Sequence, residues 1–197
     1  MKILVTGFEP FGKDTINPSW EAVKALPDEI DGCSLRKLCL PVVFGKAAHM
    51  AIEEADITQT DVILCTGLAA GREAVTPEQV AINLAYGRLP DNEGNMPSYE
   101  PIIPGGPDGL FTTLPIRDIV DRINKTGIPA SLSYTAGTYV CNDTMYRILY
   151  HYKDTHVKAG FIHLPMIPEM TKDKKSIPLR DLTKALTEAM KEIISRT

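Results

Sequence analysis

The 197-residue chain is poor in several sequence features that would assign it to a functional class. Aromatic residues make up 7% of it, and it contains a single tryptophan. No apolar run approaches the ~18 residues of a membrane-spanning helix. The net charge is −4, and basic residues are interspersed with acidic ones, so no basic stripe indicates nucleic-acid binding. The composition therefore argues against membrane and nucleic-acid partners.

Cysteine is also scarce, and its spacing indicates no pairing. Cys33, Cys39, Cys65 and Cys141 show no C-x-x-C pattern, so neither a zinc knuckle nor a thioredoxin-like pair is indicated, and no metal is expected. The first seven residues contain a short apolar run without a small-residue cleavage site, which is typical of a first strand and not of a signal peptide. We therefore expect free thiols and a cytoplasmic location.

What the sequence does contain is an alternation of strand-like and helix-like segments. Strands are expected at residues 2–6, 34–42, 61–66, 130–134 and 158–163, and helices at 18–26, 46–55, 116–125, 144–152 and 179–194. The apolar runs at 3–5 and 62–65 are typical of strands buried on both faces of a sheet. Residues 1–197 are therefore expected to form an α/β fold, a single-domain three-layer α/β/α sandwich with a largely parallel twisted sheet.

Two segments, one in the middle of the chain and one near its start, interrupt this regularity. Residues 67–115 are rich in Gly and Pro, and only 78–85 looks regular, which favours an ordered functional loop or a mobile one. Residues 7–13 fit G-x-x-x-x-G-K, but Asp14 stands where a phosphate loop needs Ser or Thr, and Pro10 has no N–H to offer a phosphate. We therefore expect no nucleotide there. Phe8 and Phe11 instead indicate an apolar wall of a site, with simple packing on the core as the alternative.

Cys141 is the cysteine whose position indicates chemistry. It joins an apolar, strand-like run to a helix-like one, and the dipole of a helix N-terminus favours the reactive thiolate. His163 ends a second strand-like run, at the position where ligand-facing groups of α/β folds gather. At the ends of two successive strands, the two side chains are expected to face one another across the sheet edge. They would then supply a nucleophile and a base.

Such a pair needs a third group to orient the imidazole, and the residues alone leave that choice open. The candidates are Glu9, Glu78, Asp91 and Asp143. Two alternatives without cysteine catalysis also remain open. His163 can be a core histidine whose ring nitrogens are hydrogen-bonded. The chain can also be a small-molecule-binding or nucleoside-processing α/β protein in which Cys141 is structural.

Six ordered motifs then give the chain a specific resemblance. They are TGFEPFG at 6–12, NPSWEA at 17–22, TPEQVAIN at 76–83, PDNEGN at 90–95, SYTAGTYVCN at 133–142 and GFIHLP at 160–165. Through these motifs the chain resembles the type I pyroglutamyl peptidases, also called pyrrolidone carboxyl peptidases, over nearly its whole length. This is a family of cysteine exopeptidases.

The resemblance implies an activity and a set of site residues. The family's catalytic glutamate, cysteine and histidine fall on Glu78, Cys141 and His163, and its pocket residues on Phe8, Phe11, Tyr139 and Val140. The implied reaction is hydrolysis of an N-terminal pyroglutamyl residue from a peptide through a thioester acyl-enzyme, without a cofactor, in a homo-oligomer expected to be a tetramer. Arg88 is a second candidate for stabilising the oxyanion. Leu68 departs from the family's glutamine, so at that position only the backbone N–H can serve.

Overall fold

Apolar segments form the centre of a six-stranded sheet. β1 (Lys2–Phe8), β4 (Val62–Leu68) and β8 (Lys158–Leu164) lie side by side and parallel, and β3 (Cys33–Leu40) is parallel to β1. The edge strands β2 (Glu29–Ile30) and β5 (Thr76–Pro77) are antiparallel to their neighbours, and the order is β2-β3-β1-β4-β8-β5. The structure, a computed structural model, describes residues 1–171 and 175–196.

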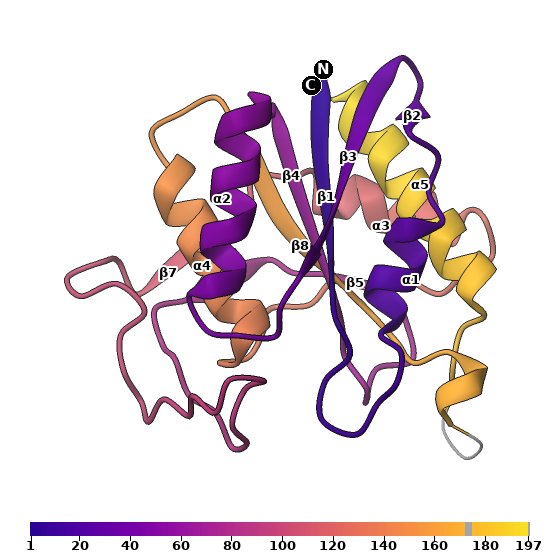
Figure 1. Cartoon of the computed structure of the whole chain (residues 1–197). Helices are drawn as coiled ribbons and strands as arrows, with labels where there is room; N and C mark the ends of the chain where they lie inside the picture. The colour runs from indigo at the N-terminus through magenta and orange to yellow at the C-terminus, as the bar shows by residue number, and fades with distance from the viewer. Residues whose placement is uncertain (172–174, 197) are drawn as a thin grey trace.

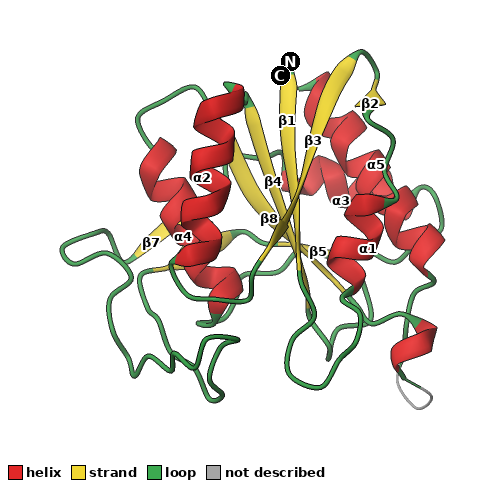
Figure 2. Ribbon diagram, viewed as in Figure 1, coloured by secondary structure: helices red, strands yellow, loops and turns green. Residues whose placement is uncertain are grey.

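Alternate side chains of these strands enter two separate cores. On one face Ile3, Val62 and Ile162 belong to a cluster with the helices α1 (Pro18–Lys24), α3 (Ile116–Asn124) and α5 (Leu179–Ser195). On the other face Leu4 and Phe161 pack with α2 (Lys46–Thr58) and α4 (Val140–Tyr152). Figures 1 and 2 show the two helical layers on either side of the sheet. The expected three-layer sandwich is confirmed, and its layers follow from the period of two in a strand.

Helix ends follow the residues that flank them. Asn17 caps α1 by accepting a hydrogen bond from the backbone N–H of Ser19, and Pro18 occupies the first helical position. Gly127, just beyond α3, has a φ of 83°, a conformation that glycine adopts without strain. Leu182, Leu186, Ala189 and Ile193 form the buried stripe of α5. No helix among the described residues is long and apolar enough to cross a membrane.

The strand expected at 130–134 is wrong as a continuous strand. The structure has two isolated bridges there, Val75 with Ala130 and Glu78 with Ser133. The N–H groups of Val75 and Gln79 donate to the carbonyls of residues 129 and 133, but between them stands Pro77, which has no N–H to continue the ladder. The segment therefore runs alongside residues 75–79 without forming a regular strand.

The middle of the chain is ordered by short elements. β6 (Val80–Ile82) pairs with β7 (Gly109–Phe111) in a two-stranded ribbon. Farther along the chain, η1 (Pro168–Met170) is a single 3-10 turn after β8. Between β6 and β7, Asn83 donates to the carbonyls of Ile103 and Gly106 and accepts from the N–H of Ile103. Side chains thus satisfy backbone groups that a regular ladder would otherwise pair.

Candidate active site

Parallel strands bring several of the predicted residues to one edge of the sheet. Phe8 ends β1, Gly67 lies one residue before the end of β4, and His163 one residue before the end of β8. Gly67 and His163 are partners in the β4–β8 register. The C-terminal edge of a parallel sheet is where α/β proteins place their ligand sites.

Cys141 lies over this edge, in the first turn of α4. The helix begins at Val140, four residues before the expected start at 144, so the cysteine is part of the helix and does not end a strand. Gly67 lies directly beneath the thiol: a Cβ added to Gly67 would be 3.1 Å from Sγ of Cys141 and 2.8 Å from Cζ of Phe161. The thiol therefore sits against the backbone of β4, beside the strand that carries His163.

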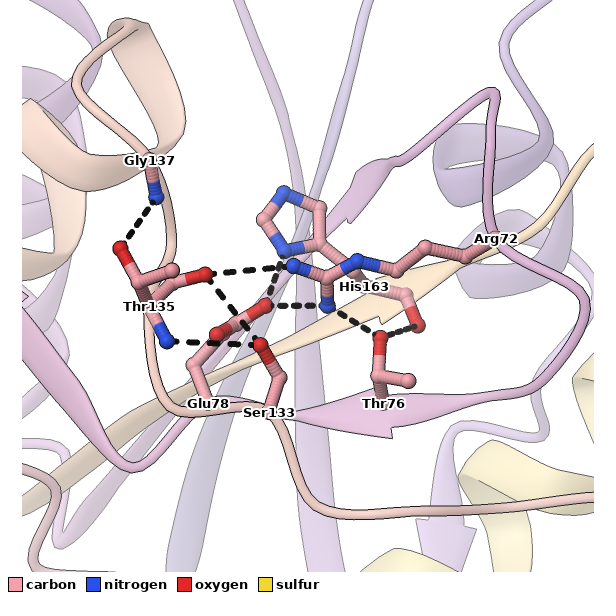
Figure 3. A network of polar contacts seen from close by, with 7 residues as sticks. All are labelled: Arg72, Thr76, Glu78, Ser133, Thr135, Gly137 and His163. Carbon is pink, nitrogen blue, oxygen red and sulfur yellow. Dashed lines mark hydrogen bonds and ion pairs between the residues drawn. The ribbon is translucent and has the colours of Figure 1, made fainter.

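Glu78 and His163 form a buried pair. Glu78 follows β5, its side chain is 0% exposed, and its N–H donates to the carbonyl of Phe161 on β8. Its Oε1 is 2.6 Å from Nδ1 of His163. Figure 3 shows the second ring nitrogen of His163 on the side away from Glu78. With Nδ1–H donating to the carboxylate, Nε2 is left as a proton acceptor.

The other candidates for the third group lie elsewhere. The carboxylate of Glu9 accepts from the N–H of Val42, and that of Asp91 from the N–H of Phe44. The carboxylate of Asp143 accepts from the N–H of Gly45 and pairs with Arg147. Of the four, Glu78 is the one in contact with His163.

Arg72 is a member of this group that reasoning from the sequence missed. Its Nη1 is 2.5 Å from Oε1 of Glu78 and also donates to Oγ1 of Thr76, while Nη2 donates to the carbonyl of Thr135 at 3.2 Å (Figure 3). In the sequence, Arg72 is the last residue of the segment 67–72, which also contains Leu68. Glu78 Oε1 thus accepts from both a histidine and an arginine.

The electrostatics of the site correct one expectation. Burial, and to a smaller extent the nearby charge of Glu78, raise the pKa of Cys141 to about 12, against the opposing effects of Arg72 and the thiol's own backbone N–H. Burial likewise lowers the pKa of His163, although the hydrogen bond to Glu78 opposes this. These shifts oppose the effect of the helix start and favour a neutral thiol beside a neutral imidazole, in which case the proton moves during the reaction.

A largely apolar cavity of about 260 Å³ opens beside Cys141. All four predicted pocket residues line it: Phe8, Phe11, Tyr139 and Val140. The rings of Phe11 and Tyr139 pack with centroids 5.6 Å apart. Phe8 is only 2% exposed and packs on Phe161, so it belongs both to the core and to the cavity wall. Leu68 also lines this cavity.

Arg88 lies in a neighbouring cavity. That space of about 400 Å³ shares the walls Phe11 and Tyr139 with the first and is also lined by Leu89. Arg88 is exposed there and is not among the described residues that line the cavity of Cys141. Among the described residues, no group of three or more His, Cys, Asp or Glu side chains is arranged to hold a metal ion.

Residues 90–95 hold the two aromatic walls in place. The carboxylate of Asp91 accepts from the N–H groups of residues 44, 93 and 95, which folds this loop onto the start of α2. Asn92 donates to the carboxylate of Glu9 at 2.7 Å and to the carbonyl of Pro10 at 3.1 Å, beside Phe11. Tyr139 donates its hydroxyl to the carbonyl of Pro90. This part of the Gly/Pro-rich middle segment is therefore a support for the cavity.

A thiol, an imidazole and a buried carboxylate lie at the C-terminal edge of the sheet in a three-layer α/β/α sandwich. These groups define the class of protein as a cysteine hydrolase. The family model for pyroglutamyl peptidases matches residues 1–196 of the chain. The chain belongs to the pyroglutamyl peptidase family.

Individual relatives are similar over almost the whole chain. A pyrrolidone-carboxylate peptidase of Lactobacillus johnsonii is 48% identical, and the match covers 100% of this chain and 94% of the relative. Among solved structures, pyroglutamyl peptidase I of Bacillus amyloliquefaciens has a TM-score of 0.94 at 47% identity, covering 98% of this chain and 97% of that one. A mutant pyrrolidone carboxyl peptidase of Pyrococcus furiosus has a TM-score of 0.94 at 38% identity, covering 100% and 99%.

Proposed function

We propose that the protein hydrolyses the bond between an N-terminal pyroglutamyl residue and the rest of a peptide, with Cys141 as nucleophile, His163 as acid and base, and Glu78 as the group that orients the imidazole. The observation that carries the proposal is the buried Glu78–His163 hydrogen bond of 2.6 Å next to a cysteine in an apolar cavity. The names of the relatives, pyrrolidone-carboxylate peptidase and pyroglutamyl peptidase I, support the choice of substrate.

The reaction proceeds in two halves. Nε2 of His163 takes the proton of the thiol as Sγ of Cys141 bonds to the substrate carbonyl carbon, and Glu78 stabilises the imidazolium that forms. The carbonyl oxygen becomes an oxyanion near the N-terminus of α4, where the first N–H groups have no partner within the helix. One such donor is typically worth about 3 kcal/mol of transition-state stabilisation. The C–N bond then breaks, and the imidazolium gives its proton to the leaving amine.

The second half releases the product. His163 takes a proton from water as the water oxygen bonds to the thioester carbon, and the C–S bond breaks to give pyroglutamate and the thiolate. The imidazolium returns its proton to Cys141. Both halves use the same proton acceptor, whose neutral state follows from its burial and the lowered pKa of His163. We also propose Arg88, in the neighbouring cavity, as a second site of charge stabilisation.

The cavity suits a substrate without an ammonium group. Pyroglutamate closes its amine into a lactam, so the ring presents two flat faces with an N–H and a C=O at its edge. Phe8, Phe11 and Val140 provide apolar surface for the faces. Of the described residues that line the cavity, Asp14 alone carries a carboxylate, and it is exposed. A site that hydrogen-bonds the edge of the lactam rejects a ring that lacks those groups far more strongly than shape alone does.

Turnover of matched substrates tests this proposal. A pyroglutamyl naphthylamide should be hydrolysed, while the prolyl naphthylamide, with the same ring but an amine in place of the lactam, should not. Iodoacetamide and the substitution Cys141→Ser should each abolish turnover, whereas Cys39→Ser, which replaces a thiol on β3, should retain it. Equal rates on the two substrates would overturn the lactam argument, and an active Cys141→Ser enzyme would overturn the assignment of the nucleophile.

We also propose that the enzyme works in the cytoplasm as a homotetramer, as the family resemblance implies. The four cysteines are free thiols in the structure, which suits a reducing compartment. Sedimentation equilibrium measures the assembly directly, and a species with the mass of one chain at all concentrations would contradict the tetramer.

A further inference from the structure

One carboxylate oxygen in the site accepts hydrogen bonds from two side chains. Oε1 of Glu78 is 2.6 Å from Nδ1 of His163 and 2.5 Å from Nη1 of Arg72. Glu78 is fully buried, whereas the side chain of Arg72 is 27% exposed. The mechanism above uses the first of these contacts and leaves the second without a role.

The second contact has a physical consequence for the first. A buried carboxylate stays charged only if a positive group or several donors compensate it. His163 does not provide that charge in the resting site, because burial lowers its pKa and favours the neutral ring. Among the described residues that contact Glu78, Arg72 is the one that always carries a positive charge.

The charge of Glu78 in turn decides where the imidazole carries its proton. A carboxylate can only accept, so Nδ1 of His163 must carry the proton and Nε2 is free to accept one from the thiol. A protonated Glu78 would instead donate to Nδ1, the proton would reside on Nε2, and the ring could no longer act as a base toward Cys141. We propose that Arg72 is a positioning residue, which keeps Glu78 ionised and thereby holds His163 in the tautomer that catalysis needs; this inference rests on the proposed function.

Arg72 is itself held on two further sides. Nη1 donates to Oγ1 of Thr76, and Nη2 donates to the carbonyl of Thr135. Thr135 belongs to a turn in which its Oγ1 accepts from the N–H of Gly137, and this turn leads into α4 and the nucleophile (Figure 3). The same guanidinium thus joins the segment that carries Glu78 to the segment that precedes Cys141.

The charged and titratable groups around Glu78 come from three elements. They are His163 on β8, Arg72 in the loop after β4, and, within electrostatic range, the thiol of Cys141 on α4. Removing Arg72 leaves a buried carboxylate beside a neutral histidine and a neutral thiol. The negative charge of Glu78 then loses its compensation, so the variant should have little activity near pH 7 and should regain activity as the pH is raised.

Kinetics across pH test the inference. Arg72→Met should lower kcat/KM near pH 7 on the order of 10²-fold, the range expected for loss of a correctly protonated base. Its acidic limb should lie at higher pH than that of the parent enzyme, and Arg72→Lys should restore both. Arg36→Met is the matched control, because Arg36 lies away from the site, where its Nε is 2.6 Å from Oε1 of Glu54. The pH dependence of kcat/KM of this variant should equal that of the parent enzyme. If Arg72→Met fails to fold, Arg72→Gln takes its place.

Two results would overturn the inference while leaving the proposed function intact. One is an equal loss of activity at every pH with an unmoved acidic limb, as a purely structural role predicts. The other is additivity of Arg72→Met with Glu78→Gln, because Arg72 should have little left to do once the charge of Glu78 is gone.

The tautomer of His163 can also be determined by a measurement that does not depend on enzyme activity. Long-range proton–nitrogen NMR correlations of the histidine rings, assigned with His163→Gln, should show the proton on Nδ1 in the parent and on Nε2 in Arg72→Met. An unchanged tautomer would overturn the inference. A parent enzyme that shows the Nδ1 proton but has no pyroglutamyl hydrolysis would instead refute the proposed function.

Discussion

Replacing Gly67 by alanine will place a methyl group between the thiol of Cys141 and the ring of Phe161. The added carbon would lie 3.1 Å from Sγ and 2.8 Å from Cζ, and Phe161 is fully buried between Phe8 and His163, with ring centroids 6.4 and 4.7 Å away. The ring cannot yield without moving these neighbours. Overpacking of this kind costs about 1–3 kcal/mol, which for a chain of this size lowers Tm by about 2–12 °C. If the added methyl group moves Sγ of Cys141 by about 1 Å, kcat/KM should also fall by about 10²-fold.

Gly71 offers a matched control in the following loop. An added Cβ there meets nothing within 4 Å, and its φ is not in the left-handed region. Gly71→Ala should therefore keep the parent activity and leave stability unchanged or about 0.4–1 kcal/mol higher. Thermal unfolding and steady-state kinetics of the two variants decide the matter: a Gly67→Ala enzyme with parent Tm and parent kcat/KM would refute the close approach of Cys141 to β4.

Three further predictions concern the carboxylate, the loop and the thiol. Glu78→Gln should lower kcat about 10³- to 10⁴-fold with KM little changed, because the imidazole loses its orienting charge; similar turnover in steady-state assays would contradict this. Asn92→Ala removes two hydrogen bonds to the loop that carries Phe11 and should cost about 1–2 kcal/mol in kcat/KM, mainly through KM, whereas an unchanged KM would show that the loop does not position the wall. The pKa of Cys141 is raised to about 12 in the folded protein. Because the folded state therefore keeps a proton that the unfolded chain loses, the free energy of unfolding falls as pH rises above about 9. At about pH 10 this loss is about 1–2 kcal/mol, and Cys141→Ser should remove it in denaturant titrations; parallel pH dependences of the two proteins would contradict the raised pKa.

The parts of the fold that sequence reasoning predicted are those fixed by local pattern. The runs at 3–5 and 62–65 are buried on both faces, as continuous apolar strands must be. The stripe of α5 and the cap at Asn17 likewise follow from neighbours within one or two turns. These signals need no knowledge of what lies across the sheet.

The parts that it missed depend on residues far apart in the chain. The segment 130–134 has strand-like residues, but the ladder it would join is interrupted by Pro77, more than 50 residues earlier. Glu78 could not be selected from the four acidic candidates because its burial depends on β5 pairing with β8. The pKa of the thiol likewise depends on distant residues: the helix start is visible in the sequence around Cys141, but the burial that raises the pKa comes from the packing of α4 on the sheet.

Trapping the acyl-enzyme tests the proposed chemistry most directly. A pyroglutamyl ester substrate, mixed rapidly with enzyme and quenched in acid, should leave a pyroglutamyl group bound as a thioester, and peptide mass mapping should place it on Cys141. The group should be lost to hydroxylamine and absent from Cys141→Ser. A pyroglutamyl group on any other residue, or full turnover with no adduct on Cys141 at any mixing time, would contradict a mechanism in which the thiol at the start of α4 is the nucleophile.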